Sequence, residues 1–224
     1  MRPERHTTRK RYSPPDAQPS GLADTRSRQA ATRVADDVLL DAARECVLAV
    51  GVRRTTLAEI ARTAKVSRMT LYRRFPDVRS VLAALMTREF GTLLQRTSVV
   101  DPEAGNARER LVRSSVATVR ALGNDPLMRT VLDRDAELVL PYIVERLGRT
   151  QLIAEQFVSA ALEAGKRDGS IRQGDRAAQV RAILLVAQSF VLSLRPATSD
   201  VDEEKLLSEF EYLLETALTP GDRS

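Results

Sequence analysis

Apolar residues recur every three or four positions along most of this 224-residue chain, and this spacing is typical of amphipathic helices. Between residues 32 and 50, for example, Val34, Val38, Ala42 and Cys46 stand four positions apart. Strand-like runs, in which apolar and polar residues alternate between turn residues, are essentially absent. We therefore expect an all-α protein of nine or ten helices. Beyond residue 100 the helices are expected at 107–122, 127–147 (two helices interrupted near Pro141), 150–166, 177–194 and 203–218.

Residues that favour helix starts and ends divide the segment before residue 100 into shorter helices. Thr56 and Glu59 form the pattern of a capping box, which starts a short helix. Ser67 is expected to start the next helix, which ends near Phe75 because the residue before a proline disfavours helical geometry. Asp77 is then expected to cap a fourth helix of about twenty residues.

The N-terminal segment differs in composition from the rest. Residues 1–30 are rich in Pro, Ser, Arg and Thr and contain few apolar residues, so they cannot bury enough surface to offset the entropy of ordering. We expect a disordered basic arm over residues 1–31. A first domain should follow at 32–97, with its first helix running from about Thr32 to a stop at Gly51. A larger helical domain should cover 98–224.

Charge is distributed unevenly along the chain. Residues 1–30 carry seven Lys or Arg against three Asp or Glu, residues 31–95 eleven against seven, and residues 96–224 seventeen against twenty. The first two parts are therefore cationic, which suits a polyanionic partner.

Single copies of cysteine and histidine, Cys46 and His6, exclude an internal disulfide and a His/Cys metal cluster. We expect neither a metal nor a cofactor. No run approaches about eighteen uninterrupted apolar residues, and the basic N-terminus lacks the apolar core of a secretory signal. The expected location is the cytoplasm.

Two of the short helices have the spacing of a helix-turn-helix. They occupy residues 56–75 and are joined by a three-residue turn, Lys65-Val66-Ser67. The side chains expected to form their shared core are Ile60, Ala61, Val66, Leu71 and Phe75. On a helix of about 100° per residue, Arg68, Met69, Tyr72 and Arg73 fall on one side of the second helix, and Leu71 and Phe75 fall on the adjoining inward side. This division predicts a recognition helix whose polar side enters the major groove.

Arg68, near the start of that helix, is the candidate for a base contact, bidentate to a guanine. Side chains on either side of it are better placed for phosphates. The complete set of predicted DNA-binding residues is Thr56, Lys65, Ser67, Arg68, Met69, Thr70, Tyr72, Arg73, Arg74 and Arg79. Taken alone, the pattern is also compatible with an amphipathic helical hairpin whose basic face is merely solvated.

From Leu39 to Leu85 the sequence resembles the DNA-binding region of the TetR/AcrR family of bacterial regulators. The matching features are Ala42-Ala43, Gly51, Thr56, Ile60-Ala61, Ala64, Val66-Ser67, Thr70-Leu71-Tyr72 and Phe75. The resemblance covers about a fifth of the chain. It implies a three-helix helix-turn-helix domain, linked by a fourth helix to a larger helical domain that binds an effector and dimerises. It also implies a regulator that binds operator DNA and is not an enzyme.

Three positions depart from the family pattern. Lys65 stands at a turn position that is usually glycine, Met69 stands where glycine is frequent, and Val78 stands where lysine is common. Lys65 is expected to strain the turn, and Met69 adds an apolar contact that suits a thymine methyl group. Arg79 or Arg74 is expected to replace the phosphate contact of the missing lysine.

The resemblance further implies a homodimer, which we assign to the helices at 150–166 and 177–194. The second of these is apolar almost all round and is expected to be buried. Dimerisation would supply two half-sites about 34 Å apart, which a single helix-turn-helix usually needs for adequate affinity.

An effector pocket within residues 107–170 is also implied, mostly apolar with a few polar groups. Its predicted wall consists of Met86, Phe90, Arg120, Met128, Leu132, Tyr142 and Phe157, with Glu137 as a second polar candidate. The aromatic content of 4% favours an aliphatic or acyl effector over a planar cationic one.

These observations favour a ligand-responsive repressor that leaves its operator when effector binds. The alternatives are a helical small-molecule carrier and a DNA-architectural protein without an effector. The cations of the arm are expected to contact DNA, so deletion of residues 1–30 should flatten the salt dependence of binding.

Overall fold

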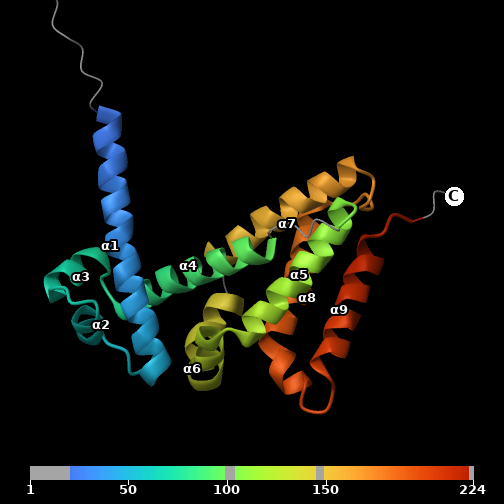
Figure 1. Cartoon of the computed structure of the whole chain (residues 1–224). Coiled ribbons are helices and arrows are strands. Elements are labelled where there is room, and N and C mark those ends of the chain that lie inside the picture. Colours follow the sequence, from blue (N-terminus) through green and yellow to red (C-terminus); the bar gives the residue numbers. More distant parts are fainter. Residues whose placement is uncertain (1–20, 99–103, 145–148, 222–224) are drawn as a thin grey trace, which may run out of the picture. The chain divides into compact units, whose positions relative to one another are not determined.

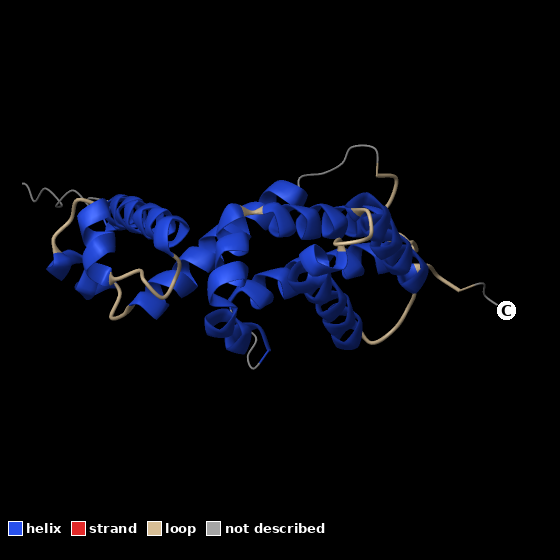
Figure 2. Cartoon of the chain, turned by 90° about the horizontal axis from the view of Figure 1, so that it is seen from below, coloured by secondary structure: helices blue, strands red, loops and turns tan. Residues whose placement is uncertain are grey.

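A computed structural model of the chain describes residues 21–98, 104–144 and 149–221, with side chains from 36 to 98, 104 to 137 and 149 to 221. It divides into two compact units, Met1–Asp37 and Val38–Ser224. Over the described residues every regular element is a helix, as expected (Figures 1 and 2). The helices are α1 (Gly21–Val50), α2 (Leu57–Thr63), α3 (Arg68–Arg74), α4 (Val78–Ser98), α5 (Ala107–Asn124), α6 (Pro126–Val144), α7 (Arg149–Arg167), α8 (Arg176–Ala197) and α9 (Glu203–Leu218).

The first helix begins eleven residues earlier than the sequence predicts, at Gly21 instead of Thr32. The low apolar content of residues 21–31 predicts that they belong to the disordered arm. That segment contains no proline, and the Ala, Arg and Gln residues within it have high helix propensity, which does not depend on burial. Residues 1–20 of the predicted arm lie outside the described residues.

One group of buried side chains, which we call the N-terminal core, holds α1 to α4 together. It includes Val47 of α1, Ile60 of α2, Leu71 of α3 and Leu85 of α4, all fully buried. Two further members, Leu127 and Val131, come from α6. The fourth helix and the sixth therefore both pack on the helices that carry the helix-turn-helix.

A second group of buried side chains, the C-terminal core, joins α5, α7, α8 and α9. Leu111 of α5, Leu162 of α7, Ile183 of α8 and Phe210 of α9 are members, and α5 packs against each of the other three helices. The ring of Phe190 lies 4.4 Å from that of Phe210. Figure 1 shows α5 beside α8 and α9 in this part of the chain.

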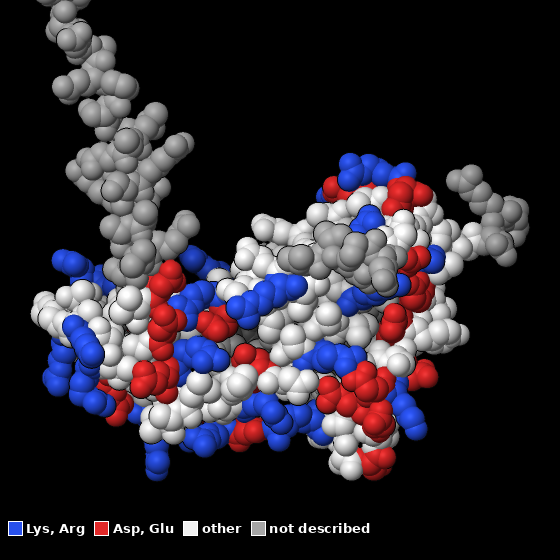
Figure 3. Space-filling model, viewed as in Figure 1, with Lys and Arg blue, Asp and Glu red and all other residues white. Residues whose placement is uncertain are grey.

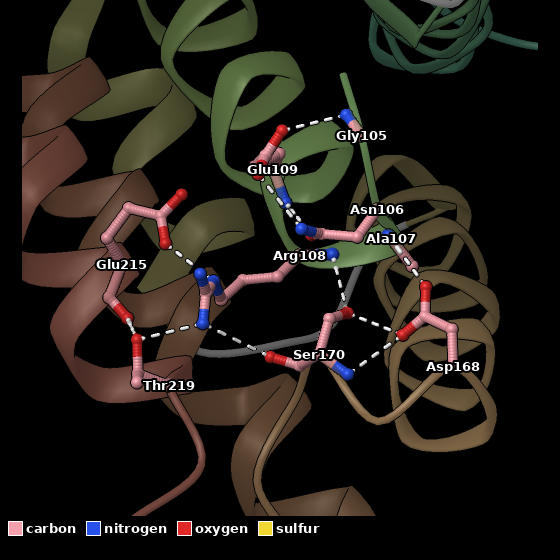
Figure 4. Close-up of polar contacts among 9 residues, drawn as sticks. All are labelled: Gly105, Asn106, Ala107, Arg108, Glu109, Asp168, Ser170, Glu215 and Thr219. Atoms are coloured by element: carbon pink, nitrogen blue, oxygen red, sulfur yellow. Dashed lines mark hydrogen bonds and ion pairs between the residues drawn. The ribbon is translucent and has the colours of Figure 1, made fainter.

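A polar cluster at one end of α5 fastens the C-terminal core (Figure 4). The Asp168 carboxylate, in the loop after α7, accepts the backbone N–H of Ala107 at 2.9 Å. The guanidinium of Arg108 donates to the Thr219 hydroxyl (3.1 Å) and pairs with Glu215 of α9, where the Nε–Oε2 distance is 2.7 Å. These contacts link the start of α5 to the α7–α8 loop and to the end of α9.

Two further expectations were wrong. The break within 127–147 lies at Asp135 (φ −140°, ψ 27°), while Pro141 lies inside the continuing helix α6. Helix α8 is buried along one side only, because Leu185 is 66% exposed and Val186 is exposed as well. An almost wholly apolar composition cannot show which side of a helix the same chain covers.

Candidate DNA-binding surface

The start of α2 is held by the capping box that the sequence predicts. The Thr56 hydroxyl accepts the backbone N–H of Glu59 at 3.2 Å, and the Glu59 carboxylate accepts the backbone N–H of Thr56 at 3.1 Å. Two of the N–H groups that a helix start leaves without partners are thereby satisfied. The start of α2 is thus fixed at its N-cap, Thr56.

The turn after α2 closes with the hydrogen bonds of a Schellman motif. The Val66 N–H donates to the Ala61 carbonyl at 3.0 Å, and the Lys65 N–H donates to the Arg62 carbonyl at 3.2 Å. This motif requires a left-handed residue, and Lys65 supplies it with φ 55°. A lysine therefore adopts the conformation that glycine adopts at lower cost, as its departure from the family pattern predicts.

Helix α3, the predicted recognition helix, is capped by the side chain of Ser67, the residue before it. The Ser67 hydroxyl accepts the backbone N–H of Thr70 at 3.1 Å and lies 2.8 Å from the Thr70 hydroxyl. Leu71 is fully buried, and Ala61 of α2 is buried as well, so the two helices approach closely. Burial of Leu71 turns the opposite side of α3 outward.

All ten residues predicted to bind DNA are exposed. Met69 is 76% exposed and Tyr72 is 50% exposed, so the outward side of α3 carries apolar surface beside its arginines. Figure 3 shows Lys and Arg side chains gathered at the end where Figure 1 places α2 and α3. Nine of these residues lie on or next to α2, α3 and their turn, and Arg79 lies at the start of α4; their binding to DNA stays a prediction.

Within residues 56–79 six Lys or Arg stand against two Asp or Glu, a net charge of +4. Both acidic groups are engaged at helix starts, Glu59 in the capping box and Asp77 with the Ser80 N–H at 2.7 Å. The surface can thus attract a phosphate backbone, and Arg68 and Met69 of α3 are exposed on it.

Charged side chains connect α1 to α4. The Arg88 guanidinium of α4 pairs with Asp41 of α1 at 2.8 Å and with its neighbour Glu89 at 2.7 Å. Glu89 in turn pairs with Arg44 of α1 at 3.4 Å. Arg88 and Glu89 are partly buried and Asp41 is exposed, so these pairs connect residues 41–44 of α1 to α4 at the protein surface.

The residues assigned to an effector pocket do not gather in the same way. Met86 packs at the edge of the N-terminal core and Phe157 at the edge of the C-terminal core. Phe90, Met128 and Leu132 are half-buried, and the side chain of Tyr142 lies outside the described residues. The Arg120 guanidinium is engaged by Glu204 of α9 at the surface, and Glu137 pairs with Arg53.

A hollow of about 500 Å³ lies along α7 and takes its lining from that helix alone. The lining residues are Leu152, Glu155, Gln156, Ser159, Ala160 and Glu163. None of the predicted effector contacts belongs to it, so the pocket assignment stays a prediction.

Comparisons with known proteins decide the family. Residues 39–85 match the sequence pattern described as "Bacterial regulatory proteins, tetR family". A protein of Mycobacterium bovis described as an uncharacterized HTH-type transcriptional regulator is 40% identical over 176 residues, which cover 79% of this chain and 90% of the relative. The chain belongs to the TetR family of bacterial transcriptional regulators.

Solved structures of TetR-type regulators share the fold. A putative TetR-family regulator from Syntrophomonas wolfei superposes with a TM-score of 0.64 at 17% identity, covering 83% of this chain and 95% of the other. FadR from Bacillus subtilis, solved in complex with stearoyl-CoA, superposes with a TM-score of 0.60 at 20% identity, covering 81% and 98%. These similarities show the fold. The membership of the family itself makes the chain a DNA-binding transcriptional regulator and not an enzyme.

One contact of this TetR-family protein escaped the sequence analysis. Asp135 of α6 is buried and reaches the turn between α1 and α2, where its Oδ2 atom accepts the Val52 N–H. The available signal is its position eight residues after Leu127 and four after Val131, on the same side of α6. An acidic residue in such a stripe is ordinarily assigned to the surface.

Proposed function

We propose that this TetR-family protein is a ligand-responsive repressor in the cytoplasm, released from its operator when a mostly apolar effector binds the C-terminal domain. The observation that carries the proposal is the division of α3, where Leu71 is buried and Arg68, Met69, Tyr72 and Arg73 are exposed. An exposed cationic helix held rigidly by a capped neighbour suits insertion into the major groove.

Arg68 has the position expected of the residue that reads a base. It is the first residue of α3 and is exposed, and its guanidinium fork matches the two acceptors of a guanine. Contacts to phosphates fix the position of a protein along the DNA but do not distinguish base sequences. We expect such contacts from Tyr72, Arg73 and Arg74, which lie about one turn after Arg68.

The test is to map the DNA bound by the protein across the genome of its host and to measure binding to the strongest site. Arg68→Ala should weaken binding to that duplex by about 1–3 kcal/mol and relax the preference at one position of each half-site. Arg96→Ala, which removes an exposed arginine from the last turn of α4, is the matched control. Unchanged affinity and preference in Arg68→Ala would show that base readout lies elsewhere.

We propose a homodimer centred on the exposed stripe of α8. Ala178, Ala182, Leu185 and Ser189 are exposed and recur at helical spacing, which forms an apolar or small-residue surface. Leu152 on α7 is exposed as well, in support of the two-helix interface predicted from the sequence. A second candidate flank is α9, on which Tyr212 and Leu213 are exposed.

An aliphatic or acyl effector is the class that we propose. Support comes from the low aromatic content of the chain and from FadR of Bacillus subtilis, whose structure contains stearoyl-CoA. Stearoyl-CoA should lower the affinity for the mapped operator, and free coenzyme A, which lacks the acyl chain, should leave it unchanged. A ligand that releases DNA should also raise expression from a reporter placed behind that operator, and a fall in expression would contradict the repressor assignment.

A further inference from the structure

One side of α6 faces the N-terminal core along three successive turns. Leu127, Val131 and Asp135 stand four residues apart and are 1%, 2% and 3% exposed. The first two are ordinary apolar members of that core. The third is a carboxylate in the position where the pattern would place another apolar side chain. Burial of a charge is unfavourable unless the group is hydrogen-bonded and paired, so its contacts are informative.

The Asp135 carboxylate is bonded to the turn that connects α1 and α2. Its Oδ2 atom accepts the Val52 N–H at 2.6 Å, across 83 positions of sequence. The preceding residue, Gly51, has φ 84°, and a Cβ atom there would lie 2.8 Å from the same oxygen. Gly51 is therefore needed twice, to adopt a left-handed conformation and to let the carboxylate approach.

The rest of that turn is held by its own residues. The Thr55 hydroxyl donates to the Gly51 carbonyl at 2.7 Å, and the Thr55 N–H donates to the Val52 carbonyl at 3.2 Å. The Val52 N–H is bonded to Asp135, which lies on α6 and not in the turn. The next residue, Thr56, is the N-cap of α2. A shift of Asp135 would thus be transmitted to the start of the helix-turn-helix within four residues.

Charge partners surround the Asp135 contact on α6. The Arg53 Nε atom lies 3.7 Å from Asp135 Oδ1, and the same guanidinium pairs with Glu137. On the other side, Asp133 pairs with Arg195 in the last turn of α8. Helix α6 is thus bound by charge both to the α1–α2 turn and to α8.

The backbone of α6 departs from helical geometry at this same residue, Asp135 (φ −140°, ψ 27°). Its side chain is the one that accepts the Val52 N–H and lies beside the Arg53 guanidinium. The break in α6 and the contact to the turn therefore lie at the same residue.

We propose that Asp135 is a positioning residue for DNA recognition, through which α6 sets the α1–α2 turn and hence the placement of α2 and α3. This inference rests on the proposed function, since it assumes that α3 binds DNA. It predicts that a change in α6 alters operator affinity through one hydrogen bond, without altering the bases that α3 prefers. By linkage, bound operator should likewise stabilise α6.

The first measurement is amide hydrogen exchange in the full-length protein. Asp135→Ala should speed exchange at Val52, and Asp135→Asn, which keeps an oxygen acceptor, should do so less. Asp133→Asn removes a neighbouring acid of α6 that does not contact the turn and should leave Val52 exchange unchanged. Equal exchange at Val52 in Asp135→Ala and wild type would overturn the proposal.

The second measurement is affinity for the mapped operator duplex, well below the unfolding temperature of each variant. Asp135→Ala should weaken binding about tenfold, within the usual range of couplings between sites, with an unchanged base preference. Bound operator should slow exchange over residues 126–137 in wild type and in Asp133→Asn, but not in Asp135→Ala. Slowing of the same extent in Asp135→Ala would overturn the proposal, because a merely structural contact leaves this response intact.

A second variant covers the case in which Asp135→Ala does not fold. Gly51→Ala places a methyl group against Oδ2 and should reproduce the faster exchange and the weaker binding. Wild-type values in both measurements would contradict the proposal. Failure of the proposed function is distinguishable, because Arg68→Ala would then leave DNA affinity unchanged while Val52 exchange still responded to Asp135.

Discussion

Met69 exposes 76% of its surface on a helix that otherwise presents arginine, threonine and tyrosine. An apolar side chain of this length costs free energy in water, and burial against a thymine methyl group would recover it. Because Met69 directly follows Arg68 on α3 and is exposed, we expect it to contact a base close to the one that Arg68 is proposed to read.

This role of Met69 can be tested with operator duplexes in which each thymine in turn is replaced by deoxyuridine, which lacks the methyl group. Wild-type protein should lose about 0.8 kcal/mol, the value of one buried methyl-sized group, at one thymine of each half-site. Met69→Ala should show no loss at that thymine. If both proteins lose affinity equally there, the methyl group is recognised by another residue.

Lys65 adopts a left-handed backbone conformation, with a φ of 55°, at the turn between α2 and α3. This conformation is strained in a residue that has a Cβ atom. Lys65→Gly should raise the free energy of unfolding by roughly 0.5–1 kcal/mol, less than the full strain because glycine also gives the unfolded chain more freedom. Lys65→Ala keeps the Cβ atom and is the control. Chemical denaturation measures the difference, and equal stability of the two variants would argue against strain.

At the level of secondary-structure elements, the polar cluster of Figure 4 holds α5 at its first turn. Asp168 bonds the Ala107 N–H, and its own geometry is set by the Ser170 hydroxyl at 2.6 Å and the Ser170 N–H at 2.9 Å. The Ser170 hydroxyl bond, with the backbone N–H groups of Ser170 and Ala107, lowers the pKa of the Asp168 carboxyl below its ordinary value. The folded protein therefore favours the charged form at this helix start.

A lowered pKa gives this contact a defined pH dependence. Its stabilisation is fully present above the ordinary pKa of an aspartate in the unfolded chain, about 3.9, and is lost as the pH falls through the lower folded value. Asp168→Asn should lower the thermal midpoint at pH 7, and its difference from wild type should shrink below about pH 4. Asp200→Asn in the loop before α9 is the control, and a difference that is constant with pH would contradict the prediction.

At the scale of the whole molecule, the buried and exposed sides of α8 bear on whether the protein associates with a second copy. Its length and apolar composition would suffice to cross a membrane, yet Val180, Ile183 and Leu194 are buried in the C-terminal core. The opposite side exposes Leu185 and Val186, which a second copy of the chain can cover. Self-association would also place two α3 helices on one DNA duplex.

Leu185→Glu should therefore weaken the proposed dimer by about 2 kcal/mol or more, as at the central residues of protein interfaces. Analytical ultracentrifugation of the Leu185→Glu protein should show monomers. Its affinity for an operator with two half-sites should fall as well. Val201→Glu changes an exposed apolar residue outside α7, α8 and α9 and is the control. Leu152→Glu and Leu213→Glu variants, measured in the same way, show whether α7 or α9 lies beside α8 in the interface. A Leu185→Glu protein that stays dimeric would contradict the proposed interface.

The helix starts at Thr56, Ser67 and Asp77 were predictable from the amino-acid pattern, and so was the buried side of α3. Capping joins residues three positions apart, and one helix turn relates Leu71 to its neighbours, so the information is local. The family could be inferred for the same reason, because its motif lies within residues 39–85.

Contacts between residues far apart in the sequence could not be predicted in this way. The bond from Val52 to Asp135, the break of α6 at that residue and the exposed side of α8 each depend on which helix lies opposite. The spacing of apolar residues indicates that one side of a helix is buried, but it does not show which other helix covers that side. It also predicts that an acidic residue such as Asp135 lies at the surface. Only the tertiary arrangement places a carboxylate of α6 within hydrogen-bond distance of the turn that leads into the DNA-binding helices.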